Sequence, residues 1–277
     1  MKKFVKNLLF TAALCLIIYV TLLAVTWLVA VIMRALLGER IAEPVWTSVY
    51  QAISYTLALT LLLFVPKLIK SLEKLLQKLL KKKSANHKKS SKTAKKKSLL
   101  ARLADLLARD PLTLAKKPTR DGLGLTGLPT WTDIGLAPIA FVASLIVSQA
   151  LLALFSLFPW FNATETQAIG YSTAIFGFDR LLAFVSLCVI APIAEELIFR
   201  GWLYGKQRLK TGAIFAILIN AIFFGVMHGQ WNVALTVGAM GAASCFLREI
   251  TGTAYSGILL HILKNSIAFI LLFVYGL

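Results

Sequence analysis

The stretch Ala191-Pro-Ile-Ala-Glu-Glu-Leu-Ile-Phe-Arg200 places three charged side chains at the end of an apolar run. The run Leu181 to Ile190 before it contains no charge, so a continuing helix carries Glu195, Glu196 and Arg200 toward a membrane core. Ionisable groups at such a depth are costly and usually functional. Glu196 and Arg200 are four residues apart on one helical face, which predicts an ion pair that supports the structure. Glu195 points about 100° away from that pair and is available for chemistry.

The composition predicts a protein that crosses a membrane several times. Of the 277 residues, 58% are hydrophobic, and the mean hydropathy of +0.77 lies outside the usual balance of a soluble globular domain. The three cysteines lie in apolar runs without CxxC spacing, so neither a disulfide framework nor a thiolate zinc site is expected. We expect an all-α fold, a polytopic membrane helix bundle.

About seven transmembrane helices are expected, since about 20 apolar residues cross the hydrocarbon core. The first apolar run is longer than the hydrophobic part of a signal peptide and lacks a small-x-small cleavage site, so we expect it to remain as a span. Pro66 is expected to end the second span. The expected spans are residues 8–33, 45–65, 134–157, 181–204, 213–227, 233–247 and 255–275.

A lysine-rich tract separates the second and third spans. Lys67 to Lys97 contains thirteen lysines and one acid, Glu73, and supplies most of the formal charge of +18. The positive-inside rule places this tract and the N-terminus in the cytoplasm. Leucines at helical spacing in its first half predict an amphipathic helix on anionic lipid, and residues 98–110 predict a second one. A nucleic-acid partner is not expected, because the interleaved aromatics of a single-strand binder are absent.

These features divide the chain into three parts. Residues 1–66 are expected to form two N-terminal transmembrane helices, residues 67–130 a basic cytoplasmic linker with amphipathic helices, and residues 131–277 a five-helix membrane core. Basic residues follow the fourth and sixth spans, which agrees with a cytoplasmic N-terminus.

Two other apolar helices carry the remaining candidate residues. His228 ends the run Phe224-Gly-Val-Met-His228, and His261 precedes Asn265 by one helical turn. A hydrolase in lipid needs a base for water and hydrogen-bond donors for the oxyanion. Glu195 suits the first task, because a carboxylate in an apolar setting can accept and return a proton near neutral pH. His228 could hold the same water, while His261 and Asn265 could donate to the oxyanion.

Each of these residues also has a structural or metal-binding explanation. His228 could be a packing residue at a helix end, and His261 and Asn265 could bond across helices. The chain has no His-Glu-x-x-His helix, yet Glu195, His228 and His261 could form a zinc site with an open position. Asn265 beside His261 favours the metal-free version, because a second donor suits an oxyanion hole.

The motif series Glu-Glu-x-x-x-Arg at 195–200, Phe-x-x-x-His at 224–228 and His-x-x-x-Asn at 261–265 resembles a known family. On successive apolar helices and in this order, it is similar to the CPBP family of intramembrane proteases, which includes the type II CAAX prenyl endopeptidases. The resemblance covers about the last hundred residues.

This resemblance implies an all-helical intramembrane endopeptidase. Glu195 and His228 would activate water, and His261 and Asn265 would stabilise the oxyanion. Members are commonly labelled metalloproteases, and some are implicated in bacteriocin processing or self-immunity, so a prenylated substrate is not implied. The expected location is the plasma membrane of a prokaryote.

The leading hypothesis is therefore an endopeptidase that hydrolyses a membrane-associated substrate, prenylated or of bacteriocin type. The competing hypothesis is a non-catalytic carrier or immunity protein that uses the same polar residues. No inverted repeat is evident in the sequence, which argues against a transporter. A fifth span running outward would carry His228 about 20 Å from its start, so either that helix begins below the surface, or it tilts, or the site lies near mid-membrane.

Overall fold

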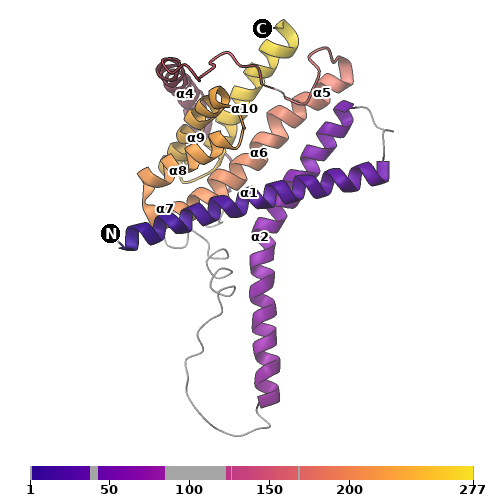
Figure 1. Ribbon diagram of the computed structural model, residues 1–277, viewed down its shortest axis with the longest axis vertical. Coiled ribbons are helices and arrows are strands. Elements are labelled where there is room, and N and C mark those ends of the chain that lie inside the picture. Colours follow the sequence, from indigo (N-terminus) through magenta and orange to yellow (C-terminus); the bar gives the residue numbers. More distant parts are fainter. Residues whose placement is uncertain (1, 38–42, 85–122, 126, 168, 277) are drawn as a thin grey trace.

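The computed structural model describes residues 2–37, 43–84, 123–125, 127–167 and 169–276. The regular elements in these ranges are all helices, which confirms the all-α fold class (Figure 1). The elements are α1 Lys2–Leu37, α2 Glu43–Ser84, α4 Trp131–Phe155, α5 Gly177–Val185, η1 Ser186–Ile190, α6 Ala191–Glu196, η2 Leu197–Tyr204, α7 Gly205–Thr211, α8 Ala213–Val226, α9 Trp231–Thr251, α10 Tyr255–Ile270 and η3 Leu271–Tyr275, where η denotes a π-helix.

Six helical stretches of the described chain are long and apolar enough to cross a membrane. The protein is therefore an integral membrane helix bundle, as expected. The run 213–227 forms α8, which has 14 residues and a length of about 21 Å, shorter than a hydrocarbon core of about 30 Å. The six stretches are Phe4–Leu37, Pro44–Lys67, Trp131–Phe155, Gly177–Thr211, Trp231–Thr251 and Tyr255–Tyr275.

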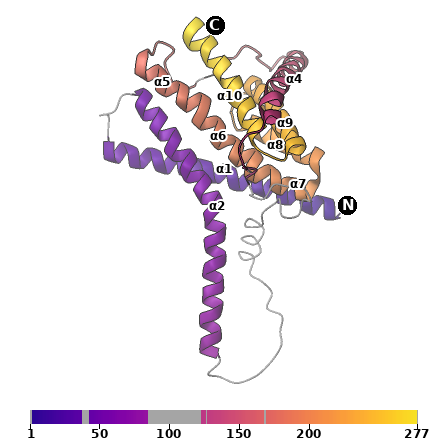
Figure 2. The ribbon, with the colours of Figure 1, turned by 180° about the vertical axis from the view of Figure 1, so that it is seen from behind.

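Pro66 lies at the end of the second apolar span, as expected, but it does not end the helix. α2 continues through Pro66 to Ser84, although its apolar part ends at Lys67. Proline removes one backbone hydrogen bond and crowds the preceding turn, which bends a helix that other contacts hold together. α2 changes direction along its length in Figures 1 and 2. The rest of the lysine-rich tract, and the helix expected over 98–110, lie outside the described residues.

The N-terminal helices pack against the C-terminal bundle. α1 contacts α2 and α7, and α2 contacts α5, η1 and α6. α9 lies between α4 and α8, and contacts both. One buried cluster joins α1 to the C-terminal helices, so both parts of the chain share a core. Its members include Leu14, Ile18, Ile198, Leu203, Phe224, Met240 and Leu260.

Glycine permits the close approach of α8 and α9. A Cβ atom at Gly225 would lie 2.4 Å from the carbonyl oxygen of Ala234, closer than non-bonded atoms can approach. The absence of a side chain at Gly225 lets the C-terminal end of α8 lie directly on α9. This packing fixes the position of His228, which follows α8 by two residues.

Candidate active site

Glu195 and Glu196 lie on a short α-helical turn between two π-helical segments. α6 carries both carboxylates, with η1 before it and η2 after it in the continuous helix Gly177–Thr211. Pro192 lies in the first turn of α6, where its ring would collide with the carbonyl four residues earlier in a regular α-helix. The preceding π turn has a different hydrogen-bond register, and such turns occur frequently at functional sites.

The same proline explains how Asn265 is held. In η1 the N–H of Ala191 donates to the carbonyl of Ser186, five residues earlier. The next carbonyl in this register, that of Leu187, would need an N–H from Pro192, which has none. Asn265 Nδ2, on α10, donates to the Leu187 carbonyl at 2.8 Å. This bond fixes the Asn265 side chain and leaves its amide one further N–H.

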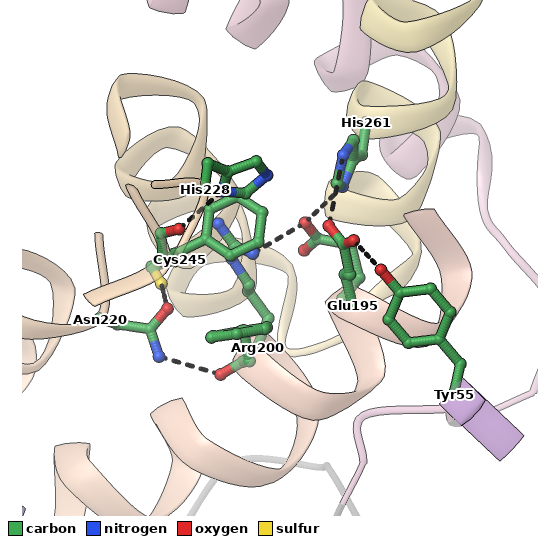
Figure 3. Close-up of polar contacts among 10 residues, drawn as sticks. Tyr55, Glu195, Arg200, Asn220, His228, Cys245 and His261 are labelled. Carbon is green, nitrogen blue, oxygen red and sulfur yellow. Dashed lines mark hydrogen bonds and ion pairs between the residues drawn. The ribbon is translucent and has the colours of Figure 1, made fainter. Parts of the chain in front are cut away.

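Glu195 is held by a tyrosine from α2. Tyr55 Oη donates to Glu195 Oε1 at 2.5 Å, a short charge-assisted hydrogen bond. Glu195 Oε2 lies 3.9 Å from His261 Nε2, which is too long for a direct hydrogen bond. Figure 3 shows Glu195 between Tyr55 and His261. One carboxylate oxygen is therefore anchored, and the other faces the histidine.

Glu196 and Arg200 form the expected ion pair, and both side chains are fully buried. Arg200 Nη1 lies 3.1 Å from Glu196 Oε1, with both side chains 0% exposed, although the two groups are not aligned for a hydrogen bond. The guanidinium also lies over the Phe224 ring, 4.1 Å from its centroid. Glu196 Oε1 is 3.2 Å from His261 Nδ1. Glu196 thus orients His261 as well as pairing with Arg200.

His228 is oriented by the backbone of α8. Its Nδ1 lies 2.9 Å from the carbonyl oxygen of Phe224, and its ring packs edge-on against the Phe224 ring. A carbonyl oxygen only accepts hydrogen bonds, so Nδ1 is the protonated nitrogen of this contact. In the neutral ring, Nε2 is left with a lone pair that can accept a hydrogen bond from water.

The four residues expected to carry the chemistry line one cavity of about 280 Å³: Glu195, His228, His261 and Asn265. They come from α6, from the segment after α8, and from α10. The sequence left open how His228, at the far end of the fifth apolar run, could reach Glu195. In the structure this run forms the short helix α8, and His228, just after its C-terminal end, lines the same cavity as Glu195. The structure therefore brings together all four residues, with Glu196 and Arg200 behind them.

Four further polar wall residues were not expected from the sequence: Gln51, Tyr55, Gln167 and Lys264. Gln51 accepts a hydrogen bond from Ser186 at 2.6 Å, so α2 contacts η1 beside the cavity. Tyr55 carries no sequence signal beyond a polar tip in an apolar run. Lys264 does carry one, because a charged residue in the apolar run 255–275 meets the same criterion that singled out Glu195.

The zinc alternative would require Glu195, His228 and His261 to bind one ion. Within the part of the chain that the structure describes, no three His, Cys, Asp or Glu side chains are grouped so that they could hold a metal ion. Nδ1 of His228 faces a backbone carbonyl and Nδ1 of His261 faces Glu196. Nε2 is therefore the ring nitrogen that each histidine leaves available, whether for water or for a metal.

Comparison with known proteins is consistent with this geometry. Residues 177–267 match the family described as "Type II CAAX prenyl endopeptidase Rce1-like". Over 152 residues the chain is 28% identical to "Putative membrane peptidase YdiL" of Bacillus subtilis (strain 168). This aligned region covers 55% of this chain and 59% of that protein. No solved structure matches the chain.

The matched region contains all three motifs and the four proposed catalytic residues, whereas α2, the loop before α5 and residues 268–273 line the cavity from outside it. The resemblance noted in the motifs is thereby confirmed: residues 177–267, which carry the motifs, match a type II CAAX prenyl endopeptidase family, and both comparisons support membership of the CPBP family of intramembrane proteases.

Proposed function

We propose that the protein is an intramembrane endopeptidase that hydrolyses a peptide bond of a membrane-associated substrate. The observation that carries this proposal is the convergence of Glu195, His228, His261 and Asn265 on one cavity within a membrane helix bundle. Ionisable groups in membrane spans are rare and usually serve a function. The name of the Bacillus subtilis relative, a membrane peptidase, supports the same class of activity.

Glu195 is the general base in this proposal. Tyr55 donates a hydrogen bond to Oε1 of Glu195. The other oxygen, Oε2, faces Nε2 of His261. A base must lie within hydrogen-bond reach of the water that it activates. The free Nε2 of His228 orients that water, since Nδ1 is engaged by the Phe224 carbonyl. The water attacks the scissile carbonyl, Glu195 takes its proton, and the same carboxyl returns a proton to the leaving amine.

His261 and Asn265 stabilise the oxyanion in this proposal. Both residues lie on α10 and line the cavity. Asn265 contributes the amide N–H that is not engaged with Leu187. His261 donates Nδ1–H to Glu196 and contributes Nε2–H when its ring carries both protons. Donors fixed in this way need no reorganisation as the charge develops.

The substrate and the setting complete the proposal. The substrate is a membrane-associated peptide or protein, prenylated or of bacteriocin type, and the reaction uses water and side chains without a metal. The N-terminus faces the cytoplasm of a prokaryotic plasma membrane, as the positive-inside rule predicts. The tract Lys67 to Lys97 contacts anionic lipid.

The test is cleavage of a library of membrane-tethered peptides by the purified full chain in liposomes. Glu195→Gln removes the base with little change in shape, and Glu165→Gln on an exposed loop is the matched control. We expect Glu165→Gln to cleave like the wild type and Glu195→Gln to show no cleavage. Cleavage that survives Glu195→Gln would overturn the role of Glu195. Glu195-dependent ion flux without any cleavage would instead support the carrier hypothesis.

A further inference from the structure

Lys264 is a cation in the wall of the candidate active site with no role in the chemistry proposed above. It lies on α10, within the membrane-spanning stretch Tyr255–Tyr275, between His261 and Asn265 in the sequence. Its side chain is partly buried and lines the same cavity as Glu195. A lysine at this position needs a partner, because an unpaired charge away from water is costly.

Among the described residues, Lys264 has no hydrogen bond and no ion pair. Glu195 is already engaged by Tyr55 and lies beside His261. The ammonium group of Lys264 therefore keeps its capacity to donate three hydrogen bonds.

A second, smaller hollow adjoins the cavity at Lys264. It has a volume of about 140 Å³ and shares three wall residues with the cavity: Gln167, Val237 and Lys264. None of the four proposed catalytic residues lines this hollow, and Lys264 is the one charged residue among the described residues that do. Lys264 thus stands where the two spaces meet.

The second hollow has a polar rim that is fixed in place. Asn232, at the start of α9, donates to the carbonyl oxygens of Ala163 and Glu165 at 3.3 and 2.7 Å. These bonds hold the loop before α5 against α9. The Thr236 hydroxyl donates to the Asn232 carbonyl, and the exposed Gln167 side chain completes the polar part of the wall.

We propose that Lys264 binds a carboxylate of the peptide substrate, held at the junction of the cavity and the second hollow. This inference rests on the proposed function, since it assigns a specificity residue to the same site. The carboxylate can be the terminal one or that of an acidic side chain. Either would enter a space that already contains Glu195, and the ammonium of Lys264 offsets the repulsion between the two negative charges.

The position of Lys264 favours this role over a second oxyanion donor. His261 and Asn265 are one helical turn apart on α10, whereas Lys264 is turned about 100° from Asn265. Its side chain also lines the second hollow, which the catalytic residues do not reach. A group bound there belongs to a part of the substrate that is displaced from the scissile bond.

Peptide retention by the full chain tests this inference without requiring cleavage. The Glu195→Gln protein, in nanodiscs of zwitterionic lipid, is incubated with a pool of N-palmitoylated peptides. Each sequence is present with a free C-terminal carboxylate and as the carboxamide. In a further set of peptides, all with an amidated C-terminus, each sequence is present with glutamate and with glutamine at one position near that terminus. The retained peptides are counted by mass spectrometry. Four proteins are compared in this Glu195→Gln background: the one with Lys264 unchanged, Lys264→Met, Lys264→Arg and the matched control Lys67→Met.

We expect at least about tenfold greater retention of one carboxylate form over its uncharged partner, as for a hydrogen bond to a charged group. The ratio should fall to about one in Lys264→Met and persist in Lys264→Arg and Lys67→Met. The peptide set that shows the preference identifies the terminal or the side-chain carboxylate. A ratio near one with Lys264 intact, or a ratio that survives Lys264→Met, would overturn the inference. Either result, with cleavage intact in the wild type, would leave the proposed function standing.

Discussion

Tyr55→Phe should lower the turnover number while leaving the fold intact. The substitution removes only the hydroxyl that donates to Glu195 Oε1 at 2.5 Å. A hydrogen bond to a charged group contributes about 1.5–3 kcal/mol, and about 1.4 kcal/mol corresponds to a tenfold change in rate. If the bond holds Glu195 in its reactive position, kcat should fall by about 10- to 150-fold. KM should change little, because the bond acts on the base rather than on the substrate.

The assay is steady-state cleavage of a peptide identified in the library, together with thermal unfolding of each variant. Tyr50→Phe is the matched control, since Tyr50 lies on the same helix but does not line the cavity. We expect kcat of the Tyr50→Phe protein to stay at the wild-type value. An unchanged kcat in Tyr55→Phe would refute the positioning role of Tyr55. Equal losses of kcat and of thermal stability in both variants would show that only the packing of α2 had been disturbed.

Four further outcomes are expected. Asn265→Ala should lower turnover by a factor of about 10² to 10³ if its amide serves the oxyanion. It should also lower thermal stability, because a carbonyl of η1 loses its donor. Loss of stability without loss of turnover would point to a structural role. Prolonged chelation should leave cleavage intact, whereas loss of activity that added zinc restores would establish a metal site. Gly257→Ala should destabilise the protein by about 1–3 kcal/mol, because the new Cβ would lie 2.8 Å from Glu196 Oε2, while Gly135→Ala, with open space at its Cβ, should unfold like the wild type. A peptide of Lys67 to Lys97 should bind vesicles more strongly as anionic lipid increases and less strongly as salt rises, since each lysine contributes about 1 kcal/mol near such a surface; binding that ignores salt would contradict this.

The parts of the site that follow from local spacing could be predicted from the sequence. Glu196 and Arg200 are one helical turn apart, and they pair in the structure as that spacing predicts. His261 and Asn265 are also one turn apart and line one cavity. These predictions need only the helical period, which holds wherever the helix forms.

The π-helical register of the fourth span could not be predicted in this way. It depends on which carbonyl each N–H selects, and Pro192 leaves one carbonyl without an N–H. The donor that satisfies it, Asn265, comes from a helix 78 residues later. The continuation of α2 through Pro66 also depends on contacts that a local rule does not include.

Tyr55 and Lys264 differ in why they were missed. Tyr55 reaches Glu195 across 140 positions of the chain, so only the tertiary packing of α2 on α6 reveals the contact. Lys264 is a charge inside an apolar run and meets the criterion that singled out Glu195. Its neighbours His261 and Asn265 matched the family motif, and the lysine between them did not enter the motif.

The ion pair behind the cavity is better explained by orientation than by stability. A buried ion pair is often no more stabilising than a well-packed apolar pair, because both charges lose their hydration. Here α9 and α10 approach the pair so closely that Gly241 and Gly257 face it: a Cβ at Gly241 would lie 2.5 Å from Arg200 Nη2, and one at Gly257 2.8 Å from Glu196 Oε2. This packing excludes water from a carboxylate that also contacts His261 Nδ1. With Glu196 fixed by Arg200, the His261 ring has one orientation, and its Nε2 points at Glu195 rather than away from the cavity.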